Sequence, residues 1–453
     1  MEFPESFLKS LQHVAGFREA EFITAHGISA PVSVRMNPKK KTDQFSRNKT
    51  VPWSASGFYL EERPSFTLDP LFHAGTYYVQ EASSMFLEYI FKKITDLSYP
   101  LKILDLCAAP GGKSTLISAL ISEESVLISN EVIKSRVHVL KENIIKWGNA
   151  HTIITNNDPA DFSVLKNYFD VIVVDAPCSG SGLFRKDKNA MNEWSAENVL
   201  LCCKRQNRIL DDVIPALKTD GILIYSTCSY SAKENEDLVQ KVLKDHPFEM
   251  IDVHPDEKWG IVETDYGLRF FPDRVRGEGF FISALKKIRE GNNIEPSQQN
   301  NSINEPFFEK VSKEEKEILE SWILNENNAE IVKRGNTFYI IPKNIMEDIE
   351  FLRTHLKIVQ TGIKAGEMKG KVFIPAHELS MSAMVNKNIP VMEVDKTTAL
   401  QYLRKQEIPY NESLLNYKRG WALVRYENQN LGWVKILETR INNYYPMEWR
   451  IKM

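Results

Sequence analysis

Two cysteines of this 453-residue chain stand where apolar segments give way to small residues. "VVDAPCSGSG" places Cys178 three residues after Asp175, and "YSTCSY" places Cys228 after another apolar segment. A buried, inert thiol is the commonest fate of cysteine, and we expect it for Cys202 and Cys203. Cys178 and Cys228 differ, because both lie at expected carboxyl ends of strands, where α/β sheets bind ligands. A zinc pair and disulfide chemistry stay open, although no further ligand has zinc spacing and no C-x-x-C is present.

The segment "ILDLCAAPGGKSTL", residues 103–116, runs from an apolar stretch through two glycines into a helical pattern. A Walker loop requires a glycine where this chain has Cys107, another thiol that we expect to be inert. The dinucleotide fingerprint requires three spaced glycines, and Gly111 and Gly112 are adjacent. Both common phosphate loops are therefore excluded. The strand–turn–helix character still predicts a polar ligand at the N-terminus of a helix.

Two acidic residues follow the next expected strands. Glu131 ends "SVLISNE", and an acid about twenty residues after such a loop commonly binds the ribose of a nucleoside cofactor. Asp158, in "NNDPADF", is placed to accept a hydrogen bond from an adenine amino group, although a lone acid is more often a helix cap. Because the loop and both acids share one expected sheet edge, the pattern favours an adenosine ligand with a charged tail. S-adenosylmethionine fits this description.

The elements that position these residues follow an α/β pattern between residues 98 and 288. Apolar strand candidates are "LKILDL", "SVLISNE", "HTIIT", "FDVIVVD", "GILIYS", "FEMIDV" and "GFFISAL". Helical patterns fall between most of them, notably over 133–147 and 195–217. Such alternation predicts a mainly parallel sheet that is covered on both faces.

The flanking regions differ in composition from this central part. Residues 1–97 begin with a helical pattern and continue with short strands, which indicates an α+β subdomain. Residues 289–306 are rich in Asn, Gln, Ser and Pro, which is typical of a linker. Beyond the linker we expect an intermediate domain over 307–385 and a small β domain over 386–453, where alternating residues on both sides of "ENQNLG" predict a hairpin.

The net charge of −3 hides an asymmetry. From residue 307 to the end, 22 Lys and Arg stand against 19 Asp and Glu, so this part is +3 and the remainder is −6. A solvated face explains this excess as well as an RNA contact does. Five cysteines without paired spacing indicate a reducing cytoplasm, and no apolar run approaches the ~20 residues of a membrane span. We therefore expect a cytoplasmic protein without membrane contact.

Taken together, these segments resemble the Sun-type RNA cytosine-5 methyltransferases, and specifically their bacterial small-subunit ribosomal RNA branch. The resemblance is carried by "SVRMNP", "GTYYVQEASSM", "DLCAAPGGKS", "DAPCSGSG", "STCSY" and "RFFPDRVRGEGFFIS". The final "GWALVRY", "LGWVK" and "NYYPMEWR" resemble the PUA-like tail of that branch. The implied fold is a Rossmann-like S-adenosylmethionine-dependent methyltransferase sheet with an N-terminal α+β subdomain and a C-terminal PUA-like β domain.

The resemblance also implies a role for individual residues. Cys228 would be the nucleophile that adds to carbon 6 of cytosine, Cys178 would assist release of the methylated base, and Asp175 would hold the N3/N4 edge. Lys113 would lie near the carboxylate of the cofactor, and Arg35 together with residues 75–84 would face RNA, unless they are structural. Besides Glu131, Asp158 and Asp175, the cofactor would contact Cys107, Ala108, Ala109, Pro110, Gly111, Gly112 and Lys113.

The implied activity is methylation of cytosine in 16S ribosomal RNA with S-adenosylmethionine, on free RNA or on the small ribosomal subunit, by a monomer. Transfer RNA is the alternative substrate. A non-catalytic ribosome-assembly factor is an alternative of another class, which the retained Cys228 disfavours. We also expect that removal of residues 307–453 leaves cofactor binding intact and weakens RNA binding.

Overall fold

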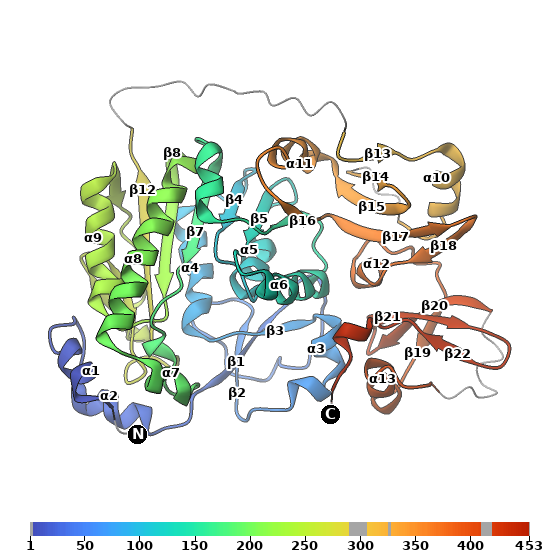
Figure 1. The fold of residues 1–453 in the computed structure, drawn as a ribbon. Coiled ribbons are helices and arrows are strands. Elements are labelled where there is room, and N and C mark those ends of the chain that lie inside the picture. Colours follow the sequence, from blue (N-terminus) through green and yellow to red (C-terminus); the bar gives the residue numbers. More distant parts are fainter. Residues whose placement is uncertain (1–2, 290–305, 325–327, 409–418, 453) are drawn as a thin grey trace.

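The computed structural model describes residues 3–289, 306–324, 328–408 and 419–452. Most of the predicted linker, residues 290–305, lies outside the described residues. The described chain forms a large central sheet, with a small three-stranded sheet beside it and two further sheets built from the C-terminal third (Figure 1).

All seven apolar segments predicted as strands contain a strand of the central sheet. This ten-stranded sheet has the order β10-β11-β12-β8-β7-β4-β5-β6-β16, and β9 pairs with β12. Its strands up to β12 are β4 (Lys102–Asp105), β5 (Val126–Asn130), β6 (Thr152–Thr155), β7 (Phe169–Asp175), β8 (Leu217–Thr227), β9 (Phe248–Met250), β10 (Val262–Thr264), β11 (Gly267–Phe270) and β12 (Phe280–Lys287). Strands β4 to β8 are parallel to one another, as the alternating pattern predicted.

The order of the parallel strands reverses between β4 and β7. From β4 the chain adds β5 and β6 on one side, and then returns to add β7 and β8 on the other side. Loops that follow the two strands at such a switch point diverge and leave a crevice at the carboxyl edge of the sheet. The glycine loop follows β4 and Asp175 ends β7, so both predicted ligand-binding segments border this crevice.

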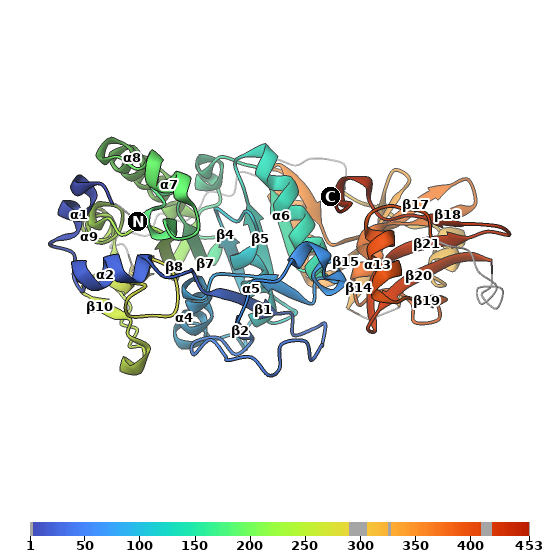
Figure 2. The same cartoon turned by 90° about the horizontal axis from the view of Figure 1, so that it is seen from below.

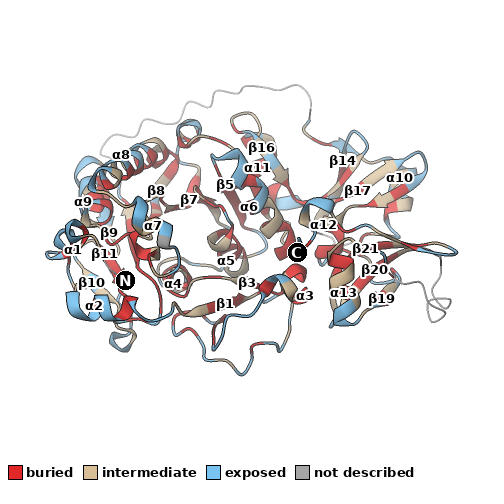
Figure 3. Ribbon diagram, turned by 60° about the horizontal axis from the view of Figure 1, so that its bottom comes forward, coloured by how far each residue is buried: buried red, intermediate tan, exposed pale blue. Residues whose placement is uncertain are grey.

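Helices cover both faces of the central sheet. The covering helices are α4 (Phe86–Ile94), α5 (Gly112–Leu120), α6 (Lys134–Trp147), α8 (Ala196–Val213) and α9 (Glu236–Asp245), whereas α7 (Lys188–Glu193) packs in a separate cluster with the N-terminal helices. Because successive strand residues point to opposite faces, Leu104 joins the apolar core under α8 and α9, whereas Ile103 joins the core under α4 and α5. Figure 2 shows α8 and α4 on opposite sides of the strands, and Figure 3 shows the buried residues along these strands.

The N-terminal subdomain packs beside the loop that follows β4. It consists of α1 (Glu5–Leu11), α2 (Glu19–His26), β1 (Val32–Met36), β2 (Gly57–Leu60), α3 (Pro70–Ala74) and β3 (Tyr77–Val79). Its antiparallel sheet has the order β2-β1-β3. Helices and strands are therefore both present, as the α+β prediction required.

The C-terminal third forms two antiparallel or mixed sheets. The first sheet has the order β13-β14-β15-β17-β18, with β13 (Glu309–Lys310), β14 (Ala329–Arg334), β15 (Thr337–Pro342), β17 (Ile363–Lys369) and β18 (Val372–Pro375). The same part of the chain also contains α10 (Lys313–Leu319), α11 (Met346–Leu352), β16 (Ile358–Thr361) and α12 (His377–Met381). The second has the order β19-β20-β21-β22 and contains β19 (Val391–Glu393), α13 (Lys396–Leu403), β20 (Gly420–Tyr426), β21 (Gln429–Ile436) and β22 (Ile441–Asn443). Strands β20 and β21 form the predicted hairpin, and its turn residues Glu427 and Asn428 both have positive φ, as a two-residue turn requires.

One strand from the C-terminal third belongs to the central sheet, which the sequence did not indicate. Strand β16 pairs antiparallel with β6. Ile341, Ile349 and Leu352 also join the same apolar core as Leu104. A chain without residues 307–453 would lose this edge strand and expose part of the core, so the expectation that such a truncation leaves cofactor binding intact stays a prediction.

Candidate active site

The two cysteines singled out in the sequence lie side by side at the crevice. Strands β7 and β8 are neighbours in parallel register, with Asp175 opposite Ser226. Each cysteine follows the end of its strand, and the Cys178 and Cys228 Sγ atoms are 3.1 Å apart. This contact, reinforced by burial, raises the pKa of the Cys178 thiol well above its ordinary value. Cys178 therefore keeps its proton at neutral pH and can donate it in a hydrogen bond to the Cys228 sulfur.

Asp175 connects the cysteine strands to the glycine loop. Its Oδ1 accepts a hydrogen bond of 2.8 Å from the Ser226 hydroxyl, and its Oδ2 lies 2.7 Å from the Lys113 ammonium. Lys113 lies in the first turn of α5, and its side chain is 11% exposed. The structure thus pairs Lys113 with the predicted base-holding acid, a partnership that the sequence did not reveal because the two residues lie far apart in the chain, on α5 and β7.

The loop that follows β4 makes a sharp turn into α5. Gly111 has φ of 114°, a conformation that favours glycine. The carbonyls of Ala109 and Pro110 accept hydrogen bonds from the Arg136 guanidinium and from the Asn143 amide, which fix the outer side of the turn. The first amides of α5 have no partner within the helix, so they remain available to a ligand at this edge.

Beneath the loop, burial raises the pKa of two side chains. Burial raises the pKa of Asp105 to about 7, and the Ser114 hydroxyl donates a 2.6 Å hydrogen bond to its Oδ2. Desolvation also raises the pKa of the Cys107 thiol, which agrees with the inert role expected for this cysteine. These residues support the loop from below.

Glu131 and Asp158 end up in different surroundings. Glu131 is 2% exposed; its Oε1 accepts from the Ile133 N–H at 2.8 Å, and its Oε2 lies 3.0 Å from the half-exposed Arg136. Asp158 caps the short 3-10 helix Pro159–Val164 and pairs with Arg208 at 3.2 Å. The capping alternative for Asp158 is therefore confirmed, and its contact with adenine stays a prediction.

The residues at this edge fit a nucleoside cofactor with a charged tail. Among the described residues, no well-aligned hydrogen bond reaches the buried Glu131 Oε2, which leaves an acceptor for a ligand hydroxyl. The α5 N-terminus and the turn at Gly111 provide a place for a carboxylate. Val132 and Ile133 are about half exposed directly after Glu131, which provides an apolar surface for a flat base.

Arg35 does not face RNA. It is 1% exposed, and its guanidinium donates to the Gln80 side chain at 2.7 Å and to the Thr115 hydroxyl at 2.6 Å, while it stacks on Trp147. None of residues 75–84 is exposed either. Because Arg35 fastens the N-terminal subdomain to α5, its structural interpretation is the correct one. The pattern "SVRMNP" could not reveal this, since Thr115 lies far along the chain.

Glu234 is another residue near the cysteines that the sequence reasoning missed. It follows Cys228 by six residues and is fully buried, and its carboxylate binds the residue after each cysteine. The only available signal was an acidic residue close to "STCSY" in the sequence.

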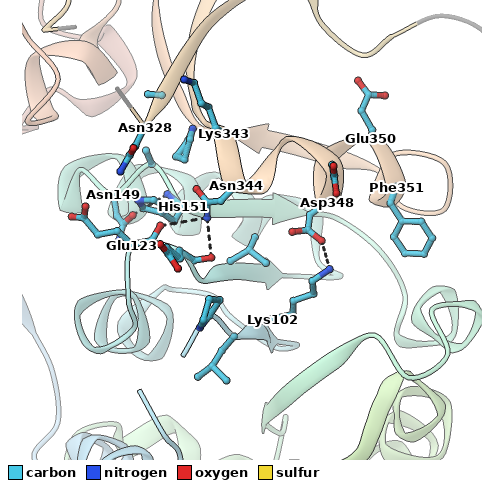
Figure 4. Close-up of a pocket in the computed structure, with 18 of the residues that line it drawn as sticks. Lys102, Glu123, Asn149, His151, Asn328, Lys343, Asn344, Asp348, Glu350 and Phe351 are labelled. Carbon is cyan, nitrogen blue, oxygen red and sulfur yellow. Dashed lines mark hydrogen bonds and ion pairs between the residues drawn. The ribbon is translucent and has the colours of Figure 1, made fainter. Parts of the chain in front are cut away.

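A large cavity lies at the opposite, amino-terminal edge of the sheet. It has a volume of about 1850 Å³ and separates the starts of β4 to β7 from the domain that contains α11 (Figure 4). Some charged side chains that line it are paired, as in Lys102 with Asp348 at 2.6 Å, and the Asn344 amide donates to the carbonyl of Glu124. The cysteines and Asp175 are not among its lining residues. This cavity is a seam between domains and contains none of the predicted site residues.

Metal chemistry and membrane insertion receive no support from the described residues. Within them, no group of three or more His, Cys, Asp or Glu side chains is arranged to hold a metal ion. None of the helices in this part of the chain combines the length and apolar character needed to cross a bilayer.

The fold and the residues at the carboxyl edge of the central sheet define a class of enzyme. A methyltransferase homologue protein from Pyrococcus horikoshii, known from its crystal structure, is 28% identical with a TM-score of 0.54, over 63% of this chain and 96% of that chain. NSun6 from the same organism, solved with SFG, has a TM-score of 0.53 at 18% identity over 64% of this chain and 99% of that chain, which supports the fold alone. The chain has the fold of an S-adenosylmethionine-dependent methyltransferase, and S-adenosylmethionine is its cofactor.

Family comparisons narrow this class. Residues 96–286 match the model described as 16S rRNA methyltransferase RsmB/F, residues 3–82 match the N-terminal domain of 16S rRNA methyltransferase RsmF, and residues 389–451 match the methyltransferase RsmF PUA domain. Ribosomal RNA small subunit methyltransferase F of Vibrio parahaemolyticus is 30% identical over 98% of this chain and 97% of its own length, and that of Serratia proteamaculans is 29% identical over 98% and 96%. The chain belongs to the RsmF branch of the 16S rRNA methyltransferase RsmB/F family. The family resemblance and the PUA-like tail predicted from the sequence are thereby confirmed.

Proposed function

We propose that this protein methylates carbon 5 of a cytosine in 16S ribosomal RNA through a covalent adduct with Cys228. The observation that carries the proposal is the pair of thiols 3.1 Å apart at the carboxyl ends of β7 and β8, beside the Asp175 carboxylate. Ordinary methylation of an oxygen or nitrogen requires no thiol, whereas carbon 5 of cytosine is too weak a nucleophile to react unaided.

Cys228 is the nucleophile of this mechanism. Its thiolate forms a bond to carbon 6. The electrons of the carbon 5–carbon 6 double bond then move onto carbon 5, which becomes nucleophilic. The Cys178 S–H stabilises the Cys228 thiolate before attack. Asp175 accepts a hydrogen bond from the N4 amino group at the N3/N4 edge of the base and is itself held by Lys113 and Ser226. Bound S-adenosylmethionine supplies an electrophilic methyl group on its sulfonium.

Cys178 acts at the release stage. Once the Cys228 sulfur is bonded to carbon 6 it no longer carries charge, so Cys228 contributes less to the raised pKa of Cys178, while burial still raises it. Cys178 then loses its proton to water, and its thiolate takes the proton from carbon 5. The electrons of that C–H bond re-form the double bond as the bond between carbon 6 and Cys228 breaks, which restores the Cys228 thiolate.

The cofactor is held at the neighbouring side of the crevice in this proposal. Glu131 binds the ribose hydroxyls, Asp158 accepts from the adenine amino group, and the loop 107–113 holds the methionine end. The target cytosine must be flipped out or unpaired to reach Cys228. The PUA domain and its basic surroundings contribute RNA affinity. The proposal also includes domains at residues 1–97, 98–288, 307–385 and 386–453, with a linker at 289–306, a monomeric state and a cytoplasmic location.

Bisulfite sequencing of ribosomal and transfer RNA, from cells with and without the gene, tests the substrate. We expect one or more 16S cytosines to be protected from conversion only when the gene is present. Protection in transfer RNA instead would make the alternative substrate correct. Unchanged protection in every RNA, with an active gene present, would contradict carbon 5 as the methylated position.

A further inference from the structure

A buried carboxylate, which the mechanism above does not use, lies between the two cysteine loops. Glu234 ends the short 3-10 helix Ala232–Glu234 and is 0% exposed. An ionised group that is removed from water requires compensating hydrogen bonds. The residues that donate these hydrogen bonds show which segments of the chain the Glu234 carboxylate holds in place.

The first donor is Ser179, the residue directly after Cys178. Its backbone N–H donates to Glu234 Oε1 at 2.8 Å, and its hydroxyl donates to Oε2 at 2.5 Å. Two bonds from one residue to one carboxylate fix both the position and the orientation of the chain at that point. Glu234 therefore sets where the Cys178 loop lies.

The second donor is Ser229, the residue directly after Cys228. Its hydroxyl donates to the same Oε2 atom at 2.6 Å. The Gln206 amide on α8 completes the set at 3.3 Å from Oε1, and it also donates to the Pro177 carbonyl. One oxygen atom thus joins the residues that follow both cysteines.

The two loops depend on Glu234 to different degrees. Ser229 has further anchors, because its carbonyl accepts from the Asn235 amide at 2.8 Å and its N–H donates to the Thr227 hydroxyl. The N–H and hydroxyl of Ser179 both donate to Glu234; around Cys178, Ser179 Oγ also lies 3.2 Å from Ser229 Oγ and the Gln206 amide holds the Pro177 carbonyl. Loss of the carboxylate should therefore displace Cys178 more than Cys228.

We propose that Glu234 is a positioning residue that holds the Cys178 thiol against the Cys228 thiol and thereby times release of the RNA adduct. The inference rests on the proposed function for the roles of the two cysteines, but the spatial part stands on the hydrogen bonds alone. Glu234 touches neither the base nor the cofactor loop in this arrangement, so its effect reaches the reaction through Cys178.

The spatial part is tested without RNA by dibromobimane, which reacts with two adjacent thiols to form a covalent bridge. Mass mapping of the bridged peptides separates a Cys178–Cys228 link from one between Cys202 and Cys203. We expect the Cys178–Cys228 link in the intact protein and a severalfold lower yield in Glu234→Ala. Glu234→Gln should restore much of the yield, because an amide can still accept from Ser179 and donate to a hydroxyl oxygen.

The chemical part uses substrate RNA, S-adenosylmethionine and denaturing electrophoresis. Glu234→Ala should accumulate a protein–RNA adduct that disappears when Cys228→Ala is added, while its cofactor affinity stays within about twofold of the intact protein. The matched control is Glu236→Gln, two residues away, which loses a buried pair with Arg269 but no contact to Ser179. It should keep both the bridge and normal release.

The following results would overturn either the positioning role of Glu234 or the proposed function. Unchanged bridging and unchanged adduct release in folded Glu234→Ala would overturn the proposal. If Glu234→Ala does not fold, Ser179→Ala, which removes only one of the two bonds, must show lower bridging and slower release, or the proposal fails. If Cys178→Ala and Cys228→Ala both leave methylation unchanged, the proposed function fails, whereas the bridging yields still test the position of Cys178.

Discussion

At the carboxyl edge of the central sheet, Lys113 contacts Asp175 and Cys178 contacts Cys228, whereas the amino edge borders a cavity of about 1850 Å³. The proposed chemistry belongs to the carboxyl edge. Loops that leave parallel strands at a switch point diverge and leave a crevice, and the side chains at the carboxyl ends of the strands border it. At the amino edge Lys102 pairs with Asp348 across a domain boundary. Strand direction, and not the size of a void, locates the site.

The largest expected effect separates the carboxyl edge of the sheet from its amino edge, and it uses two acidic residues on the same strand. Asp175 ends β7 in the crevice, and Asp170 lies near its start, where it pairs with Lys218 at 2.6 Å. Asp175→Ala should lower the single-turnover methylation rate about 10²-fold or more, because it removes the group that holds the base and balances Lys113. Asp170→Asn should leave the rate per folded molecule within about twofold. Equal losses of methylation rate in the two variants would contradict the claim that only the carboxyl edge takes part in the reaction.

The second prediction concerns the cofactor side of the carboxyl edge. Glu131→Ala should weaken S-adenosylmethionine binding about tenfold, since hydrogen bonds to a charged acceptor are lost. Isothermal titration calorimetry measures the affinity, and circular dichroism checks that the variant is folded. An unchanged affinity in a folded variant would take Glu131 out of the site.

The third prediction follows from the raised pKa of Cys178. A raised pKa means less thiolate at neutral pH, and therefore slow alkylation by iodoacetamide. Cys228→Ala removes the hydrogen bond that is the largest cause, so the pKa of Cys178 should fall toward its ordinary value. Its alkylation at pH 7.5 should then become severalfold faster, as followed by mass spectrometry of the Cys178 peptide. Slower or unchanged alkylation would show that Cys228 does not control the protonation of Cys178.

The smallest effect is expected at the amino edge. Asp348→Asn removes the partner of Lys102, and the Asp348 side chain is 10% exposed whereas that of Lys102 is 38% exposed. We expect the free energy of unfolding to fall by about 1–2 kcal/mol, because the pair is only partly buried. Methylation rate and cofactor affinity should not change. A loss of activity without a loss of stability would place this edge in the catalytic machinery.

The sequence predicted the central part of the fold well, and local patterns explain why. Buried parallel strands produce continuous apolar segments, so β7 was visible as "FDVIVVD", and its carboxyl end placed Asp175 and Cys178 at the crevice. The hairpin of β20 and β21 was likewise visible from alternating residues. These features depend on neighbours in the sequence.

Features that depend on distant partners were missed. Strand β16 pairs with β6 although some two hundred residues separate them, so no local pattern indicated that the C-terminal third completes the central sheet. The family resemblance left Arg35 either as an RNA contact or as a structural residue; Thr115 and Gln80 accept its hydrogen bonds in the interior, which shows the structural role. Glu234 was missed for the same reason, since its donors come from two loops and from α8.

The most direct test of the central claim compares the two crevice cysteines on a denaturing gel with substrate RNA and S-adenosylmethionine. Cys228→Ala should neither methylate RNA nor form an adduct, because no thiolate then adds to carbon 6. Cys178→Ala should accumulate an adduct that survives denaturation and requires Cys228, whereas Cys107→Ala should trap nothing. If Cys228→Ala traps RNA and Cys178→Ala does not, the two roles are reversed, and if neither substitution alters methylation, the covalent mechanism is contradicted.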